Sequence, residues 1–208
     1  MRKIIIVALA FLSAATFAAE TNSMSAEAEA KYTRAIEGRT AAILKILALS
    51  DTNKIAHVHD AIIAQYRALN AWHDANDSKL KAARGDKNAT AQIRASLETL
   101  HKDFLAKLAQ DLTPEQVDEV KDKMTYGKVQ FTFRGYITQY PNLSEANKEK
   151  ILELLKEARE LAMDGGSAEE KTAVFQKYKG KINNYLSKQG IHPEKKKKKP
   201  EESAEPAK

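Results

Sequence analysis

The chain has 208 residues, of which 43% are hydrophobic and 30% charged, with eight glycines, five prolines and no cysteine. This balance is typical of a helix-rich globular protein and excludes collagen-like, low-complexity and disulfide-based chains. The formal charge is +6, but Arg2 and Lys3 carry two of these charges and residues 194–208 carry two more, which leaves +2 for residues 19–193. A nearly neutral body without a basic, aromatic-rich stripe is not expected to bind nucleic acid.

The first eighteen residues are organised like a secretory signal peptide. Arg2 and Lys3 precede an apolar run from Ile4 to Leu12, and small residues follow it up to Ala18, which is the order that export signals have. The apolar run is shorter than the roughly 20 residues that a membrane-spanning helix needs. We therefore expect cleavage after Ala18 and a bacterial protein that is periplasmic or secreted, with no membrane span in its mature form.

Residues 19–193 are predicted to form a single all-α domain, a bundle of about five or six helices. A first amphipathic helix is expected to follow Ser25 and to end before Ser50. Ser50 is then the predicted N-cap of one long helix near residues 50–84, which neither glycine nor proline interrupts. A third helix is predicted at about residues 89–110, because its apolar residues recur every three or four positions.

Helix-start signals organise the second half of the chain. The sequence Thr113-Pro114-Glu115-Gln116 predicts a capping box with proline at the first helical position. Residues 128–134 alternate, so a short strand is an alternative, but an extended entry into a short helix is favoured because an isolated strand would lack a partner. Ser144 is expected to cap the next helix, Gly165-Gly166 to end it, and Ser167 with Glu170 to open the last.

Residues 194–208 contain a run of five lysines followed by a polar remainder. Such a segment cannot bury apolar surface, so we predict a disordered tail. Contact between its lysines and anionic surfaces of the cell envelope is an alternative.

Two resemblances extend these predictions. Leu112-Thr113-Pro114-Glu115-Gln116 matches the Leu-Thr-x-x-Gln motif of the small periplasmic proteins that include the Spy and CpxP chaperone group. That resemblance implies a helical cradle that shields unfolded proteins without ATP. A fuller resemblance, to the exported bacterial domain-of-unknown-function 3826 family, covers nearly the whole mature chain. It is carried by residues 63–70 with 72–74, 112–116 with 123–127, and 177–186, and it implies fold and export but no activity.

The long helix near residues 50–84 carries the polar groups that are best suited to bind a ligand. On a helical wheel five of them fall within roughly 60° of one another, and two more lie on the adjoining flank. The candidate ligand-binding residues are His59, Tyr66, Arg67, Asn70, His73, Asp74 and Asp77. A secondary set contains Tyr126, Asn183 and Asn184, which could supply hydrogen bonds and stacking to a sugar or peptide, although helix packing and a turn are the favoured explanation. It also contains Lys179, which could assist His73 in acid–base chemistry.

This helix alone does not supply enough ligands for a metal ion. His57 and His59 point roughly 200° apart on a helix, so they cannot share an ion. His73 and Asp77 lie one turn apart and could share one, but the third ligand would have to come from another helix. We expect His73 to be a hydrogen-bonded side chain at the edge of the core. No metal, cofactor or catalytic residue is predicted.

Taken together, these patterns favour a non-enzymatic binding or chaperone-like protein of the cell envelope, with an unknown protein, peptide or glycan as its partner. The alternative is a ligand- or metal-binding envelope protein that uses the His/Tyr/Asn/Asp face, with catalysis left open. An enzyme is less expected, because the chain has no nucleophile elbow, no phosphate-binding glycine loop and no cysteine.

Overall fold

The computed structural model describes residues 25–193, and all of the regular structure in this range is helical. The prediction of an all-α protein is confirmed, although seven helices occur in the described range where five or six were expected. The helices are α1 (Ala26–Leu47), α2 (Thr52–Ala82), α3 (Lys87–Leu108), α4 (Pro114–Met124), α5 (Lys128–Gln139), α6 (Glu145–Met163) and α7 (Ala168–Lys188). The predicted signal peptide and lysine-rich tail lie outside the described residues.

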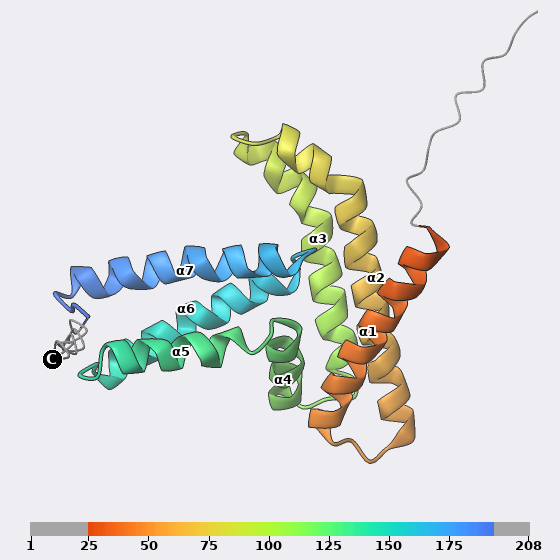
Figure 1. Ribbon diagram of the computed structural model, residues 1–208, viewed down its shortest axis with the longest axis horizontal. Coiled ribbons are helices and arrows are strands. Elements are labelled where there is room, and N and C mark those ends of the chain that lie inside the picture. Colours follow the sequence, from red (N-terminus) through yellow and green to blue (C-terminus); the bar gives the residue numbers. More distant parts are fainter. Residues whose placement is uncertain (1–24, 194–208) are drawn as a thin grey trace, which may run out of the picture.

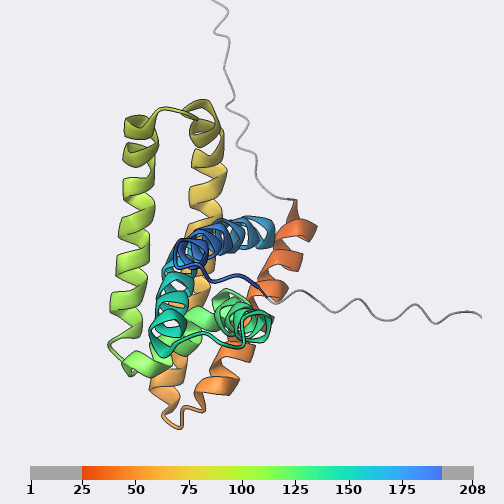
Figure 2. The same cartoon turned by 90° about the vertical axis from the view of Figure 1, so that its left-hand side faces the viewer.

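The helices form two groups that run in different directions. In Figure 1, α2 and α3 make an upright hairpin with α1 packed along α2, while α5, α6 and α7 extend sideways from it. Figure 2 shows the second group almost end-on in front of the hairpin. The short helix α4 lies at the joint and contacts both α1 and α6. No helix of the described range is long and apolar enough to cross a membrane.

Each group has its own hydrophobic core. The first is built around Ile36, Ile62 and Phe104, and the second around Leu155 and Ile182. Met163, the last residue of α6, nevertheless packs into the first core. The end of α6 and the beginning of α7 are therefore held against the α1–α2 pair, and this junction is where the polar groups gather.

The helix starts follow local capping chemistry, with one correction. Thr113 and Gln116 form the predicted capping box, and the Ser144 hydroxyl accepts the Asn147 amide. The predicted N-cap Ser50 is wrong, because α2 is capped by Asp51. The Asp51 carboxylate accepts the amides of Asn53 at 2.8 Å and Lys54 at 3.2 Å, two of the first amides of the helix, which have no acceptor within it.

The expected extended entry at residues 128–134 is also wrong, because α5 is helical from Lys128 onward. Gly127 adopts a left-handed conformation with φ of 63° that separates α4 from α5. The buried positions of α5 are Val129, Thr132 and Tyr136, which have helical spacing. The alternation was misleading because Phe131 is apolar yet 70% exposed, so it contributes to the pattern without belonging to the core.

Candidate functional site

Two of the predicted site residues serve to join helices. His59 contacts the carboxylates of Glu37 on α1 and Asp60 on α2, each at 2.9 Å. Arg67 donates to Glu29 on α1 at 2.7 Å. These contacts lie between α1 and α2, and neither side chain lines any of the cavities described below. They account for these two side chains as links between the first two helices.

Tyr66 and Asn70 lie elsewhere, around a cavity that we call the junction cavity. It has a volume of about 80 Å³ and lies where α1, α2, the α4–α5 turn and the start of α7 meet. Its polar lining consists mainly of Tyr32, Arg39, Tyr66, Asn70, Tyr126 and Lys171. Tyr126 of the secondary set thus joins the primary set here, while Asp74 lies outside the cavity and accepts a hydrogen bond from Asn70 at 3.1 Å.

Lys171 provides a buried positive charge beside this cavity. Its side chain is 5% exposed, and its ammonium donates to the carbonyl oxygens of Met124 at 3.3 Å and Met163 at 3.1 Å. These residues end α4 and α6, so the charge lies at the negative ends of two helix dipoles. Burial lowers the pKa of Lys171 to about 8, which leaves it mostly protonated at neutral pH. One of its three donors has no partner among the described residues.

Tyr66 and Arg39 form another side of the cavity. The Arg39 guanidinium lies 5.8 Å from the centroid of the Tyr66 ring, within the range of a cation–π contact. Tyr66 is 8% exposed, and within residues 25–193 its hydroxyl has no hydrogen-bond partner. Burial raises the pKa of Tyr66 to about 12, with Arg39 acting in the opposite direction. The hydroxyl therefore stays protonated and remains available as a donor.

The start of α7 completes the cavity. The Ser167 hydroxyl accepts the Glu170 amide at 3.1 Å, as the predicted capping box requires. In a capping box the Glu170 carboxylate would in turn accept the amide of Ser167. Here it accepts the amide of Gly166 instead, at 2.8 Å. This brings Glu170 back over the α6–α7 loop. As in every α-helix, the amides in the first turn of α7 have no acceptor inside the helix.

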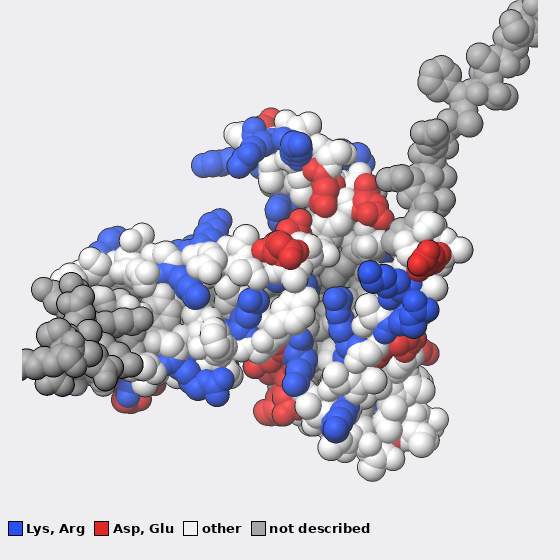
Figure 3. All heavy atoms as spheres, viewed as in Figure 1, with Lys and Arg blue, Asp and Glu red and all other residues white. Residues whose placement is uncertain are grey.

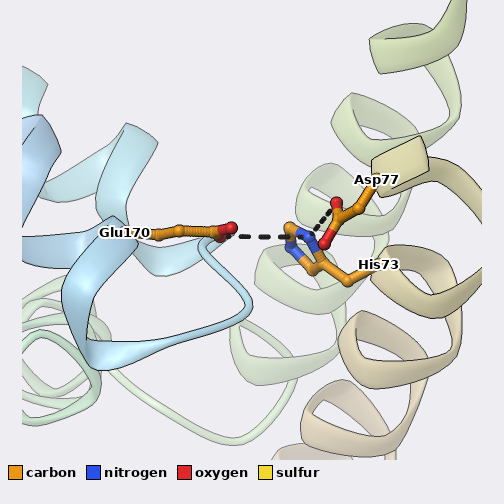
Figure 4. A group of neighbouring side chains, drawn as sticks. All are labelled: His73, Asp77 and Glu170. Atoms are coloured by element: carbon orange, nitrogen blue, oxygen red, sulfur yellow. Dashed lines mark hydrogen bonds and ion pairs between the residues drawn. The ribbon is translucent and has the colours of Figure 1, made fainter. Parts of the chain in front are cut away.

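His73 lies on the other side of the same loop. Its Nε2 donates to the Asp164 carbonyl oxygen at 2.7 Å, and its Nδ1 lies 2.9 Å from Asp77 and 3.9 Å from Glu170. Figure 4 shows Asp77 and Glu170 reaching the ring from α2 and α7. Partial burial opposes protonation, but the bonds to Asp164 and Asp77 raise the pKa of His73. The prediction of a hydrogen-bonded histidine at the core edge is confirmed.

Gly166 allows this close approach of loop and histidine. A Cβ atom added there would lie 2.7 Å from the His73 Cγ atom, a distance that would require the ring or the loop to move. Gly165-Gly166 was predicted only as a helix end. Its second role is to let the loop lie directly on the His73 ring, which positions Glu170 beside the histidine.

The remaining secondary candidates are not part of the junction. Lys179 and Asn183 line a groove of about 700 Å³ between α5 and α7. The Tyr136 hydroxyl donates to the Asn183 side chain at 2.8 Å and to the Lys179 carbonyl oxygen at 3.1 Å. Asn184 is exposed and lines none of these cavities. Lys179 and Asn183 therefore link α7 to Tyr136 of α5, away from Tyr126.

Several junction residues were not among the predicted site residues, including Tyr32, Arg39, Glu170 and Lys171. A signal for Lys171 was present, since it precedes the inward-facing Phe175 and Tyr178 by four and seven positions and so shares their face. Arg39 lies on a mostly exposed part of α1, and Glu170 had an explanation as a capping residue. Nothing local indicates that either would reach a partner on another helix.

Comparison with curated proteins finds no match. The model of a family described as "Protein of unknown function (DUF3826)" matches residues 33–205. The match includes the His73 cluster and, apart from Tyr32, the residues of the junction cavity. Because it spans most of the sequence, the chain belongs to the DUF3826 family.

Proposed function

We propose that this protein is a non-enzymatic binding protein of the cell envelope that holds an anionic group of its ligand, such as a carboxylate, sulfate or phosphate, in the junction cavity. The observation that carries the proposal is Tyr66, a residue that is 8% exposed and lines a cavity with two cationic side chains, and whose hydroxyl has no hydrogen-bond partner in the described structure. No carboxylate is among the described residues that line this cavity.

The lining groups are suited to an anion in different ways. Arg39 is exposed and forms no ion pair with any described residue, so its guanidinium is free to pair with an oxyanion. The remaining Lys171 donor, the Tyr66 hydroxyl and the first amides of α7 add donors, and the helix N-terminus adds a favourable dipole. Figure 3 shows basic side chains gathered over α1 and around the junction.

The size of the cavity limits what it can enclose. A cavity needs about 10 to 15 Å³ of internal volume to hold one water, so about 80 Å³ holds a few waters or one small anionic group. The half-exposed Tyr126 and the exposed Arg39 lie at its rim. A larger ligand, such as an acidic glycan or peptide, would therefore insert its anionic group and leave the remainder outside.

Titration calorimetry at low ionic strength with inorganic phosphate, sulfate and acetate tests the proposal. At least one of these anions is expected to bind at a single site. Replacing Arg39 with glutamine should weaken that binding by about 10- to 100-fold, because a charge-assisted hydrogen bond contributes about 1.5 to 3 kcal/mol. Tyr66→Phe, which removes only the hydroxyl, should weaken it by a smaller factor.

Arg34→Gln is the matched control, since Arg34 is an exposed residue of the same helix outside the cavity lining. The two variants lose the same charge, so general electrostatic attraction would be reduced equally in both. An equal loss in both variants, or the absence of binding by all three anions, would contradict the proposal and leave ordered water as the occupant of the cavity.

A chaperone-like activity is a second candidate, and the exposed apolar surface of α5 favours it. Phe131 is 70% exposed at the groove between α5 and α7, where it could contact an unfolded client. Near-stoichiometric protein should then reduce light scattering from an aggregating denatured client, and Phe131→Ser should reduce this protection at least twofold. Protection that is absent for several unrelated clients, or unchanged by the substitution, argues against this candidate.

A further inference from the structure

We infer that His73, Asp77 and Glu170 form a binding site for a divalent transition-metal ion, with zinc as the ion to test. One potential ligand atom from each of the three side chains lies within 4.8 Å of the other two. Imidazole nitrogen and carboxylate oxygen are common zinc ligands. His73 and Asp77 alone offer two ligands one helical turn apart, and the fold adds Glu170 from α7 as the third (Figure 4).

His73 differs from His59 and His101 in which ring nitrogens the neighbouring carboxylates approach. The carboxylates near His59 and His101 lie at opposite nitrogens of each ring, so they cannot converge on one ion. At His73 both carboxylates lie at Nδ1, while Nε2 donates to a backbone carbonyl. A ligating histidine typically has this arrangement, because the bond from its second nitrogen fixes the tautomer and the ring orientation.

The distances are compatible with an ion that binds between the three groups. Zinc binds nitrogen and oxygen at about 2.0 to 2.2 Å, so the ligands of a tetrahedral ion lie roughly 3.3 to 3.5 Å from one another. The Nδ1 atom of His73 lies 2.9 Å from Asp77 and 3.9 Å from Glu170, which brackets that separation. Asp77 and Glu170 are each about half exposed, so small rotations of their side chains can equalise the two distances.

Two features of the α6–α7 loop support a preformed site. The Gly166 amide donates to the Glu170 carboxylate at 2.8 Å, which directs this side chain back toward the histidine. Gly166 also packs directly on the His73 ring, and the ring is held by its bond to the Asp164 carbonyl oxygen. Only Asp77 among the three ligands lacks such a restraint from the loop.

Three protein ligands leave an open coordination position, and a cavity of about 280 Å³ adjoins it. His73, Asp77 and Glu170 line this cavity together with Arg94. Zinc sites with three protein ligands typically complete their coordination with water or with a ligand atom. The bound ion would thus be reachable from solvent, and the Arg94 guanidinium offers a second positive group for an anionic molecule that coordinates it.

This site does not depend on the proposed anion binding. Its ligands line a different cavity from Tyr66, Arg39 and Lys171, and the loop at residues 165–166 separates the two. Failure of one proposal therefore leaves the other unaffected, and the variants that test them do not overlap.

The experiment is calorimetric titration of the purified, metal-free protein with zinc chloride, together with cobalt substitution read by its visible absorption. We expect one zinc ion per chain and a tetrahedral cobalt spectrum. Glu170→Gln should weaken zinc binding by about 100-fold or more, since loss of a mere supporting contact to a metal site costs 10- to 100-fold. The glutamine side-chain oxygen can still accept the Gly166 amide, so the loop should keep its fold.

Glu169→Gln is the matched control, because Glu169 is an exposed neighbour that makes no ion pair with a described residue. Asp77→Asn and Asp74→Asn form a second pair on α2, of which only the first should weaken binding. Thermal melts without metal confirm that each variant folds. The inference is overturned if zinc fails to bind the wild-type protein, or if Glu170→Gln and Glu169→Gln bind zinc with equal affinity.

Discussion

Replacing Arg159 with methionine should lower the free energy of unfolding by about 2 to 4 kcal/mol. The side chain is 4% exposed, and its guanidinium donates from α6 to Asp118 at 2.6 Å and to Asp122 at 2.7 Å on α4. Methionine preserves much of the buried volume but leaves two carboxylates without their shared cation. The cost is large because a partly desolvated charge loses its partner.

Lys156→Met provides the comparison for this variant. Lys156 also approaches Asp118, at 3.9 Å, but its side chain is 51% exposed, and exposed ion pairs contribute about 0 to 1 kcal/mol. Chemical denaturation of both variants measures the difference. If both variants lose the same free energy of unfolding, burial of the Arg159 ion pairs adds nothing to stability beyond the positive charge near Asp118.

The second large effect is a pH dependence that originates at His101. Its Nδ1 lies 3.0 Å from Asp164 and its Nε2 lies 3.6 Å from Glu160, and these two carboxylates raise the pKa of His101 to about 9. Lys121 and Arg159 also contact Glu160, so the cluster joins α3, α4 and α6. The protonated imidazole should stabilise the folded state by about 3 kcal/mol at pH 6.5.

The direction follows from the raised pKa. The folded state holds the proton more tightly than the unfolded state, so the stabilisation is complete below about pH 6.5 and is lost as the pH rises through about 9. Lys171, whose burial lowers its pKa to about 8, acts in the opposite direction over an overlapping range. The wild-type curve alone therefore mixes the two effects.

Subtracting a His101→Gln variant isolates the histidine, because Lys171 is the same in both proteins. The difference in free energy of unfolding between wild type and variant should be about 3 kcal/mol at pH 6.5 and close to zero near pH 10. Chemical denaturation at a series of pH values measures it. A difference that stays constant with pH would show that His101 contributes only by packing.

The helices themselves could be predicted from the sequence, with two exceptions. Capping by Thr113 and Ser144, the helix end at Gly165-Gly166 and the long α2 depend on interactions within a few residues, which local patterns record. The α2 cap was misplaced by one residue, since Ser50 and Asp51 are both good caps and only the backbone conformation chooses between them. In α5 the exposed Phe131 obscured the helical period.

The candidate site was predicted only in part. The sequence placed Tyr66, Asn70, His73 and Asp77 on one face of α2, but it could not show that this face divides between two cavities. That division depends on the α6–α7 loop, which meets α2 at Gly166 and His73. His59 and Arg67 share the same helix but lie against α1, where carboxylates pair with them.

What the sequence by itself determined is therefore the class of fold, the position of most helices and the polar face of α2, because caps and hydrophobic periodicity act over one or two turns. Only the tertiary structure decided which groups meet. His73 and its partner Asp164 lie 91 positions apart, and their contact depends on the packing of Met163 into the first core and on the missing side chain of Gly166. Such contacts result from the packing of whole helices against one another, which no local pattern encodes.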